Sequence, residues 1–281
     1  QVQPVRATVS AGGGSASLNG RANTAGDVAG AVTMDIGSTD GYCRALALPA
    51  PGLPAGLGRS VKASMDLTLT TARQLSLRDV VADLGGNALR GAADISLNGT
   101  PQVNAQFDAG ALNLSALTSG DGGSSEAVGA GWPKDAIDAS GLAAFNGDIA
   151  LRAASIALGT FTLGQTRTLI SNDRSRMVVE LREVQAYEGT VTGEFVMNNR
   201  NGLSVGGKIA AGGIGLKPVL TDAADIDRLE GRADFRLSFL GVGHSVDAIM
   251  KSLRGAPAMG PAGRRFSTAL ARASPCATAI C

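Results

Sequence analysis

Residues 89–108 read LRGAADISLNGTPQVNAQFD, and this stretch decides the fold. Apolar or small residues occupy the odd positions from Leu89 to Leu97, and mostly polar residues occupy the even ones. After a turn at Gly99-Thr100-Pro101 the alternation continues as far as Phe107. Because successive side chains of a strand point to opposite faces, a period of two residues predicts a pair of strands with one apolar and one polar face.

This hairpin belongs to a longer unit that occurs twice, in residues 74–118 and 177–220. Leu77-Arg78-Asp79-Val80 in the first copy returns as Leu181-Arg182-Glu183-Val184 in the second. In both copies the positions of the apolar residues change parity once, between the Leu and the Val of this tetrapeptide. An extra residue at a β-bulge causes such a change, so the shared parity change predicts a repeated supersecondary unit.

Composition limits the class of protein. The chain has 281 residues, enough for one large or two ordinary domains. It contains 39 glycines, and 44% of its residues are hydrophobic, which together indicate many short strands joined by glycine-containing turns. The net charge of +1 does not favour nucleic acid as a partner. The three cysteines Cys43, Cys276 and Cys281 lack metal-ligand spacing, so no metal site is expected. We expect no cofactor either.

The same patterns divide the chain into four parts. We expect an N-terminal β-repeat part in residues 1–118 and a C-terminal one in residues 132–255. Residues 119–131 (SGDGGSSEAVGAG) have the composition of a linker. In residues 256–281 the alternation stops and acidic residues are absent, which fits a basic, disordered tail or a stretch translated out of frame.

Two short helices are expected in the C-terminal part. Residues 245–253 place Val246, Ile249, Met250 and Leu253 at helical spacing, so this helix should close the part. Residues 217–231 should hold the other helix, with Thr221 or Asp222 as its N-cap and Gly231 past its end.

One motif could carry chemistry. Residues 202–206 (GLSVG) match the G-x-S-x-G nucleophile elbow, in which a strand precedes the serine and a helix follows it. Here a turn precedes Ser204 and an alternating strand follows it, and the chain's one histidine, His244, would have to serve as the base. A serine hydrolase is therefore the least favoured function, and we expect no enzyme.

Residues 229–237 (LEGRADFRL) and 241–255 (GVGHSVDAIMKSLRG) resemble the C-terminal region of the AsmA family. Trp132-Pro133 and Tyr187-Glu188-Gly189 are similar to that family as well, and the resemblance covers about residues 61–255. It implies a non-enzymatic protein of the Gram-negative envelope that supports outer-membrane assembly or phospholipid transport. The resemblance also implies a periplasmic location and an N-terminal inner-membrane helix, which this chain does not contain. The chain should then be a fragment or a processed form of a longer protein.

The apolar faces of the strands can be accommodated in two ways. Two sheets could cover each other in a β-sandwich, which would suit an interaction or scaffold module without lipid cargo. One long curved sheet could instead leave its apolar face free to hold acyl chains, and the resemblance favours this second fold. The candidate groove residues are then Val61, Met65, Leu67, Leu69, Ile95, Leu97, Val103, Phe107, Val191, Phe195, Met197, Val205, Ile209, Phe235, Leu237 and Phe239.

Overall fold

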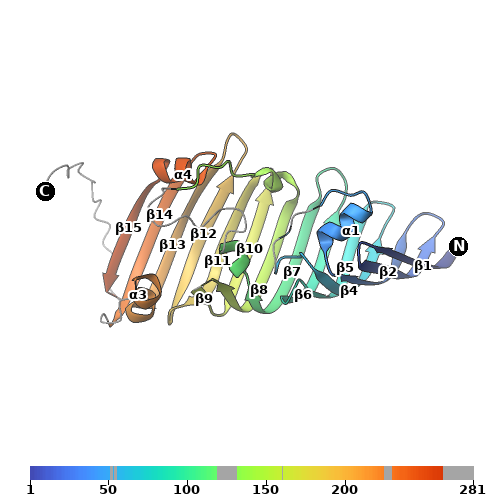
Figure 1. Ribbon diagram of the computed structural model, residues 1–281, viewed down its shortest axis with the longest axis horizontal. Helices are drawn as coiled ribbons and strands as arrows, with labels where there is room; N and C mark the ends of the chain where they lie inside the picture. Colours follow the sequence, from blue (N-terminus) through green and yellow to red (C-terminus); the bar gives the residue numbers. More distant parts are fainter. Residues whose placement is uncertain (51–52, 54–55, 119–131, 160, 225–229, 262–281) are drawn as a thin grey trace.

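The chain forms one long, curved, open β-sheet (Figure 1). The computed structural model describes residues 1–50, 53, 56–118, 132–159, 161–224 and 230–261. Neighbouring strands of the sheet follow the order of the sequence, except that β9 pairs only with β8 and leaves β8 and β10 adjacent. The curved-sheet expectation is confirmed. The sandwich alternative is wrong for the described residues, because all of their strands belong to this single sheet.

The strands are β1 (Val2–Ala11), β2 (Gly14–Asn23), β3 (Val28–Ile36), β4 (Val61–Leu69), β5 (Gln74–Asp83), β6 (Ala88–Ser96), β7 (Gln102–Asn113), β8 (Asn146–Leu158), β9 (Phe161–Leu163), β10 (Thr166–Asp173), β11 (Arg176–Ala186), β12 (Gly189–Asn198), β13 (Ser204–Gly215), β14 (Arg232–Val242) and β15 (Arg254–Pro261). The helices are α1 (Thr39–Ala45), α2 (Ser115–Thr118), α3 (Leu216–Ala224) and α4 (Val246–Ser252), with a 3-10 turn η1 at Ser140–Ala143.

The repeated unit and its two bulges are present as predicted. The pairing of β5 with β6 shifts register between Leu77 and Val80, and that of β11 with β12 shifts between Leu181 and Val184. In each copy the extra residue at the shift keeps the apolar side chains before and after it on one face of the sheet.

The two faces of the sheet differ as the alternation predicts. Exposed ion pairs join neighbouring strands on the polar face, with Asp35 Oδ2 3.5 Å from Lys62 Nζ and Asp94 Oδ1 2.7 Å from an Arg78 guanidinium nitrogen. The Ser76 hydroxyl and then the Arg78 guanidinium lower the pKa of Asp94 from its ordinary value. Because these charges are in water, their contribution to stability is small.

One strand pair departs from the antiparallel pattern. β7 and β8 pair in parallel, from Gln102 beside Asn146 to Asn113 beside Ala157. This pairing joins the two repeat-containing parts into a continuous sheet. The linker expected at residues 119–131 lies outside the described residues.

The expectation of a disordered tail over residues 256–281 is wrong for the first residues of that range. Residues 254–261 form β15, which pairs antiparallel with β14 from Arg254 beside Leu240 to Pro261 beside Ala233. The exposed edge of β14 accepts this strand even though its sequence lacks alternation, because backbone groups make the pairing. The remainder of the expected tail, residues 262–281, lies outside the described residues.

Two helices differ from expectation. α3 begins at Leu216, so Thr221 is not its N-cap but lies within it and donates its hydroxyl proton to the Lys217 carbonyl oxygen at 2.9 Å. α1 falls in a stretch without alternation, and the Ser38 hydroxyl caps it by accepting from the Gly41 N–H at 3.2 Å. The helix expected at residues 245–253 is confirmed as α4, with Ser245 as N-cap.

Two groups of buried apolar side chains lie near the ends of the strands. Leu112, Ala153 and Ile156 form one cluster where β7 meets β8. Near the β1–β2 turn, Tyr42 of α1 lies against Gly14 and donates its hydroxyl proton to the Val9 carbonyl oxygen at 3.1 Å. Among the residues that the structure describes, no second layer of strands or helices covers the middle of the apolar face.

Candidate functional site

The candidate site is the middle of the apolar face, where one row of directly paired residues crosses the whole sheet. Each strand on the path from β1 to β15 contributes one residue, and none of these residues has a polar side chain. The row, called the apolar row below, consists of Val5, Gly20, Gly30, Leu67, Leu77, Ala93, Ala105, Ile149, Ile170, Val179, Phe195, Gly207, Phe239 and Gly255. At about 4.8 Å per strand, it runs for about 60 Å.

The side chains of this row are shielded only in part. Ala93 is buried, with 5% of its surface exposed, whereas Leu67, Ile170 and Phe195 are half-buried. In a β-sandwich a second sheet would cover these side chains and bury them. The backbone N–H and C=O groups of a sheet pair within its plane, so the surface that remains is hydrocarbon. The middle of the sheet therefore presents an extended apolar surface to its surroundings.

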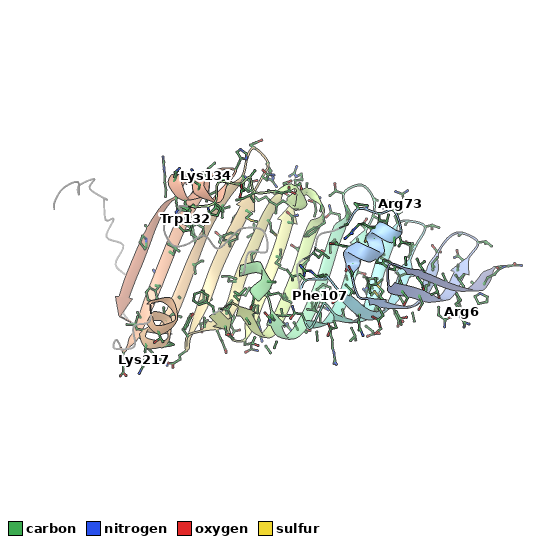
Figure 2. All side chains as sticks on the ribbon, viewed as in Figure 1. Arg6, Arg73, Phe107, Trp132, Lys134 and Lys217 are labelled. Carbon is green, nitrogen blue, oxygen red and sulfur yellow. The ribbon has the colours of Figure 1, made fainter. Side chains whose placement is uncertain are left out.

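Phenylalanine rings lie over glycines on this face. Phe107, in the middle of the sheet (Figure 2), pairs directly with Gly91. Gly207 lies between Phe195 and Phe239, whose ring centroids are 6.2 Å apart and whose planes meet at 42°. A methyl group on Gly207 would lie 3.0 Å from Cε1 of Phe239. The glycines thus leave room for large rings to lie close to the backbone.

Fifteen of the sixteen predicted groove residues lie in strands on this one face. β4 contributes Val61, Met65, Leu67 and Leu69, and the others, apart from Leu97, lie in β6, β7, β12, β13 and β14. Direct pairings connect Val103 with Ile95 and Leu237 with Ile209 across the strands. Leu67 pairs with Leu77 of β5, which was not among the predicted residues. Leu97 follows the end of β6 and is 37% exposed, so it lies outside the strand pairings that connect the other residues.

No groove residue was predicted in β1, β2, β3, β5, β8, β10, β11 or β15, although each of these strands contributes to the apolar row, and β10 shows why. β10 (TRTLISND) places Thr166, Thr168, Ile170 and Asn172 on the apolar face, and Leu169 on the polar one. This strand has no clear alternation of its own. Its neighbours set its orientation, through the pairing of Ile170 with Ile149 and with Val179.

A segment of the chain covers one end of the apolar face. Residues 133–145, called the strap below, run along the ends of the strands from α4 to the start of β8 (Figure 1), and Trp132 and Lys134 lie near α4 (Figure 2). The Asp247 N–H donates to the Pro133 carbonyl at 2.9 Å, and the Ile137 N–H donates to the His244 carbonyl at 2.8 Å. Backbone hydrogen bonds thus tie one end of the strap to α4.

Asn172 of β10 holds the other end of the strap. Its Nδ2 donates to the carbonyl oxygens of Leu142, at 2.9 Å, and Phe145, at 2.7 Å. Only 3% of Asn172 is exposed. A pocket of about 260 Å³ lies between the strap and the sheet, lined on the sheet side by Asn172, Met177, Met197 and Val205. The strap therefore encloses a small part of the apolar face.

Ser204 lies on the polar face, at the start of β13. Its hydroxyl donates to the Asn198 carbonyl oxygen at 3.5 Å, while His244 is exposed beside Gly202. A turn precedes the serine and a strand follows it, as the sequence indicated, so the backbone of a nucleophile elbow is not formed here.

Within the described residues, no group of three or more His, Cys, Asp or Glu side chains is placed to hold a metal ion. Among the helices of these same ranges, none combines the length and apolar character needed to cross a bilayer. No protein-family model, curated protein or solved structure matches the chain.

Proposed function

We propose that this protein binds acyl-chain lipids on its apolar face and carries them without catalysis. The observation that carries the proposal is the apolar row, which crosses every strand on the path from β1 to β15 without a polar side chain. A site that selects a small polar molecule usually contains several directed hydrogen-bonding groups. A hydrocarbon chain needs only continuous apolar contact.

The dimensions suit a lipid chain. Each methylene transferred from water to an apolar site gains about 0.8 kcal/mol, but a lipid already has this gain in its bilayer. A carrier can compete only if it covers most of the chain. The hydrocarbon core of a bilayer is about 30 Å thick, so a row of about 60 Å exceeds the length of a single acyl chain.

The side chains along the row also suit movement of the ligand. They are mostly alanine, valine, leucine and isoleucine, which hold a chain by contact area and not by specific bonds. A chain moving along the row keeps similar contacts at each strand. Transport between membranes requires this property, and the proposal extends to phospholipid transport or outer-membrane assembly in a Gram-negative envelope. The periplasmic location and the inner-membrane anchor of a longer protein are the part of the proposal that comes from the resemblance to the AsmA family.

The proposal is tested by purifying the protein from bacteria without detergent, extracting it with organic solvent, and identifying lipids by mass spectrometry. We expect phospholipid or another acyl-chain lipid in a stable ratio to protein. A preparation without lipid that also takes up none from labelled vesicles would overturn the proposal. The apolar face would then be a protein-binding surface of an interaction or scaffold module.

A further inference from the structure

Asn172, which lines the pocket beneath the strap, has a buried side-chain acceptor without a hydrogen-bond partner among the described residues. Asn172 uses both hydrogens of Nδ2 to hold the strap, but its Oδ1 has no hydrogen-bond partner although it is buried. A second buried asparagine, Asn87, shows the usual arrangement. Its Nδ2 donates to the Gly56 and Asn113 carbonyls, and its Oδ1 accepts from the Asn113 N–H at 2.7 Å. A buried carbonyl oxygen without a donor destabilises a fold, so the free acceptor at Asn172 needs an explanation.

The surroundings of Asn172 are mainly hydrocarbon. Met177, Met197 and Val205 line the pocket from the sheet, and Leu142 and Phe145 line it from the strap. Asp138 is the other polar side chain of the lining, and its carboxylate accepts from the Ser140 N–H at 2.9 Å. Asn172 is thus the one lining side chain with a buried polar atom that lacks a partner.

The pocket adjoins the apolar row. Met177, Met197 and Val205 are two residues from Val179, Phe195 and Gly207, on the same strands and the same face. A chain lying on the row can therefore enter the pocket without crossing a polar side chain. Because a 150 Å³ apolar cavity holds benzene, a volume of about 260 Å³ holds about ten carbon atoms.

We propose that this pocket binds the hydroxyl-bearing end of a single-chain lipid, with Asn172 Oδ1 accepting the hydroxyl hydrogen. The inference rests on the proposed function, because the rest of the chain lies along the apolar row. Asn172 would then provide a hydrogen-bond acceptor on a surface that otherwise binds lipids through hydrocarbon contacts alone. Lipids with a donor at this position are bound in preference to lipids of the same length without one.

The test compares 1-octanol with octyl methyl ether, which has no donor. The readout is the NMR signals of methionine methyl groups, because Met177 and Met197 line the pocket whereas Met65 lies on the open part of the face. We expect both compounds to shift the Met65 signal, and octanol to shift Met177 and Met197 with roughly five- to tenfold higher affinity than the ether. The protein is unchanged in this comparison, so the strap stays in place.

Two variants sharpen the test. Val205→Phe fills the pocket and should remove the preference for octanol, whereas Val191→Phe, outside the pocket on the same face, should retain it. Equal affinities of the two compounds at Met177 and Met197, or shifts confined to Met65, would overturn the inference and leave the proposed function standing. An absence of shifts at all three methionines would contradict the proposed function itself.

Discussion

The ring of Phe107 lies over Gly91, its direct partner on the neighbouring strand. A methyl group on Gly91 would lie 2.7 Å from Cδ1 of that ring and would collide with the Gln106 carbonyl oxygen. In the second repeat, Gly193 pairs in the same way with Ile209. Glycine at this position therefore allows close packing of the neighbouring side chain against the backbone of the sheet.

Gly91→Ala should destabilise the protein. The backbone of two paired strands cannot move apart without loss of its hydrogen bonds, so we expect a loss of about 1–3 kcal/mol in the free energy of unfolding. Urea denaturation measures the loss. Gly110→Ala in β7 is the matched control, because a methyl group there has no heavy atom of the described chain within 4 Å, and its effect should stay within about 0.5 kcal/mol. Equal effects of the two substitutions would contradict the packing argument.

Leu67→Asn should reduce bound lipid while changing the free energy of unfolding by less than about 2 kcal/mol. The side chain is half-buried on the apolar face, so the new amide keeps access to water and does not incur the full cost of a buried polar group. Thr68→Asn on the opposite face should leave lipid content unchanged. Lipid mass spectrometry and urea denaturation provide the two readouts, and Ile209→Asn should behave like Leu67→Asn. If the variants at Leu67 and Ile209 unfold the protein and the wild type carries no lipid, the face is a dry interface.

Asn172→Ala should loosen the strap. The substitution removes both hydrogen bonds to the Leu142 and Phe145 carbonyls in a buried site, so we expect a loss of about 2–3 kcal/mol in the free energy of unfolding. Hydrogen exchange should become faster at the Ile137 N–H in the strap, but not in β4. Asn104→Ala, at an exposed position on β7, serves as the control. Unchanged exchange in the strap would show that α4 alone holds it.

Asp27 should make stability depend on pH in the acidic range. The Thr71 backbone N–H, at 2.7 Å, and then the Asn23 side chain, at 2.8 Å, lower the pKa of Asp27 from its ordinary value of 3.8. Because the folded pKa lies below the unfolded one, this stabilisation is present above about pH 4 and is lost as the pH falls through the folded pKa. Asp27→Asn should therefore be less stable than the wild type near neutral pH, and the difference should shrink as the pH falls below about 4. A difference between the two proteins that does not vary with pH would contradict this account.

The sequence pattern alone was sufficient to predict the strands in which polar and apolar residues alternate, because the alternation shows on which face each side chain lies. β4 alternates along its whole length, and the parity change at Leu77 and Val80 predicted a bulge that is present. The pattern was not sufficient where neighbours decide the structure. β15 forms because β14 offers an edge, and β10 takes its orientation from β8 and β11. The role of Asn172 depends on a strap that lies about thirty residues earlier in the chain, and no local pattern encodes that contact.

The parallel pairing of β7 with β8 determines how the two repeats are related. In a purely antiparallel sheet each step along the path reverses the strand direction, and β5 and β11 are five steps apart. Five reversals would point the two copies in opposite directions. Because the step from β7 to β8 is parallel, only four of the five steps reverse the strand direction, and the two copies point the same way. One copy is therefore carried onto the other by a shift of about 24 Å along the sheet that follows its twist and does not reverse the strand direction. A gene that duplicated this unit head to tail could lengthen the apolar face by a fixed increment each time.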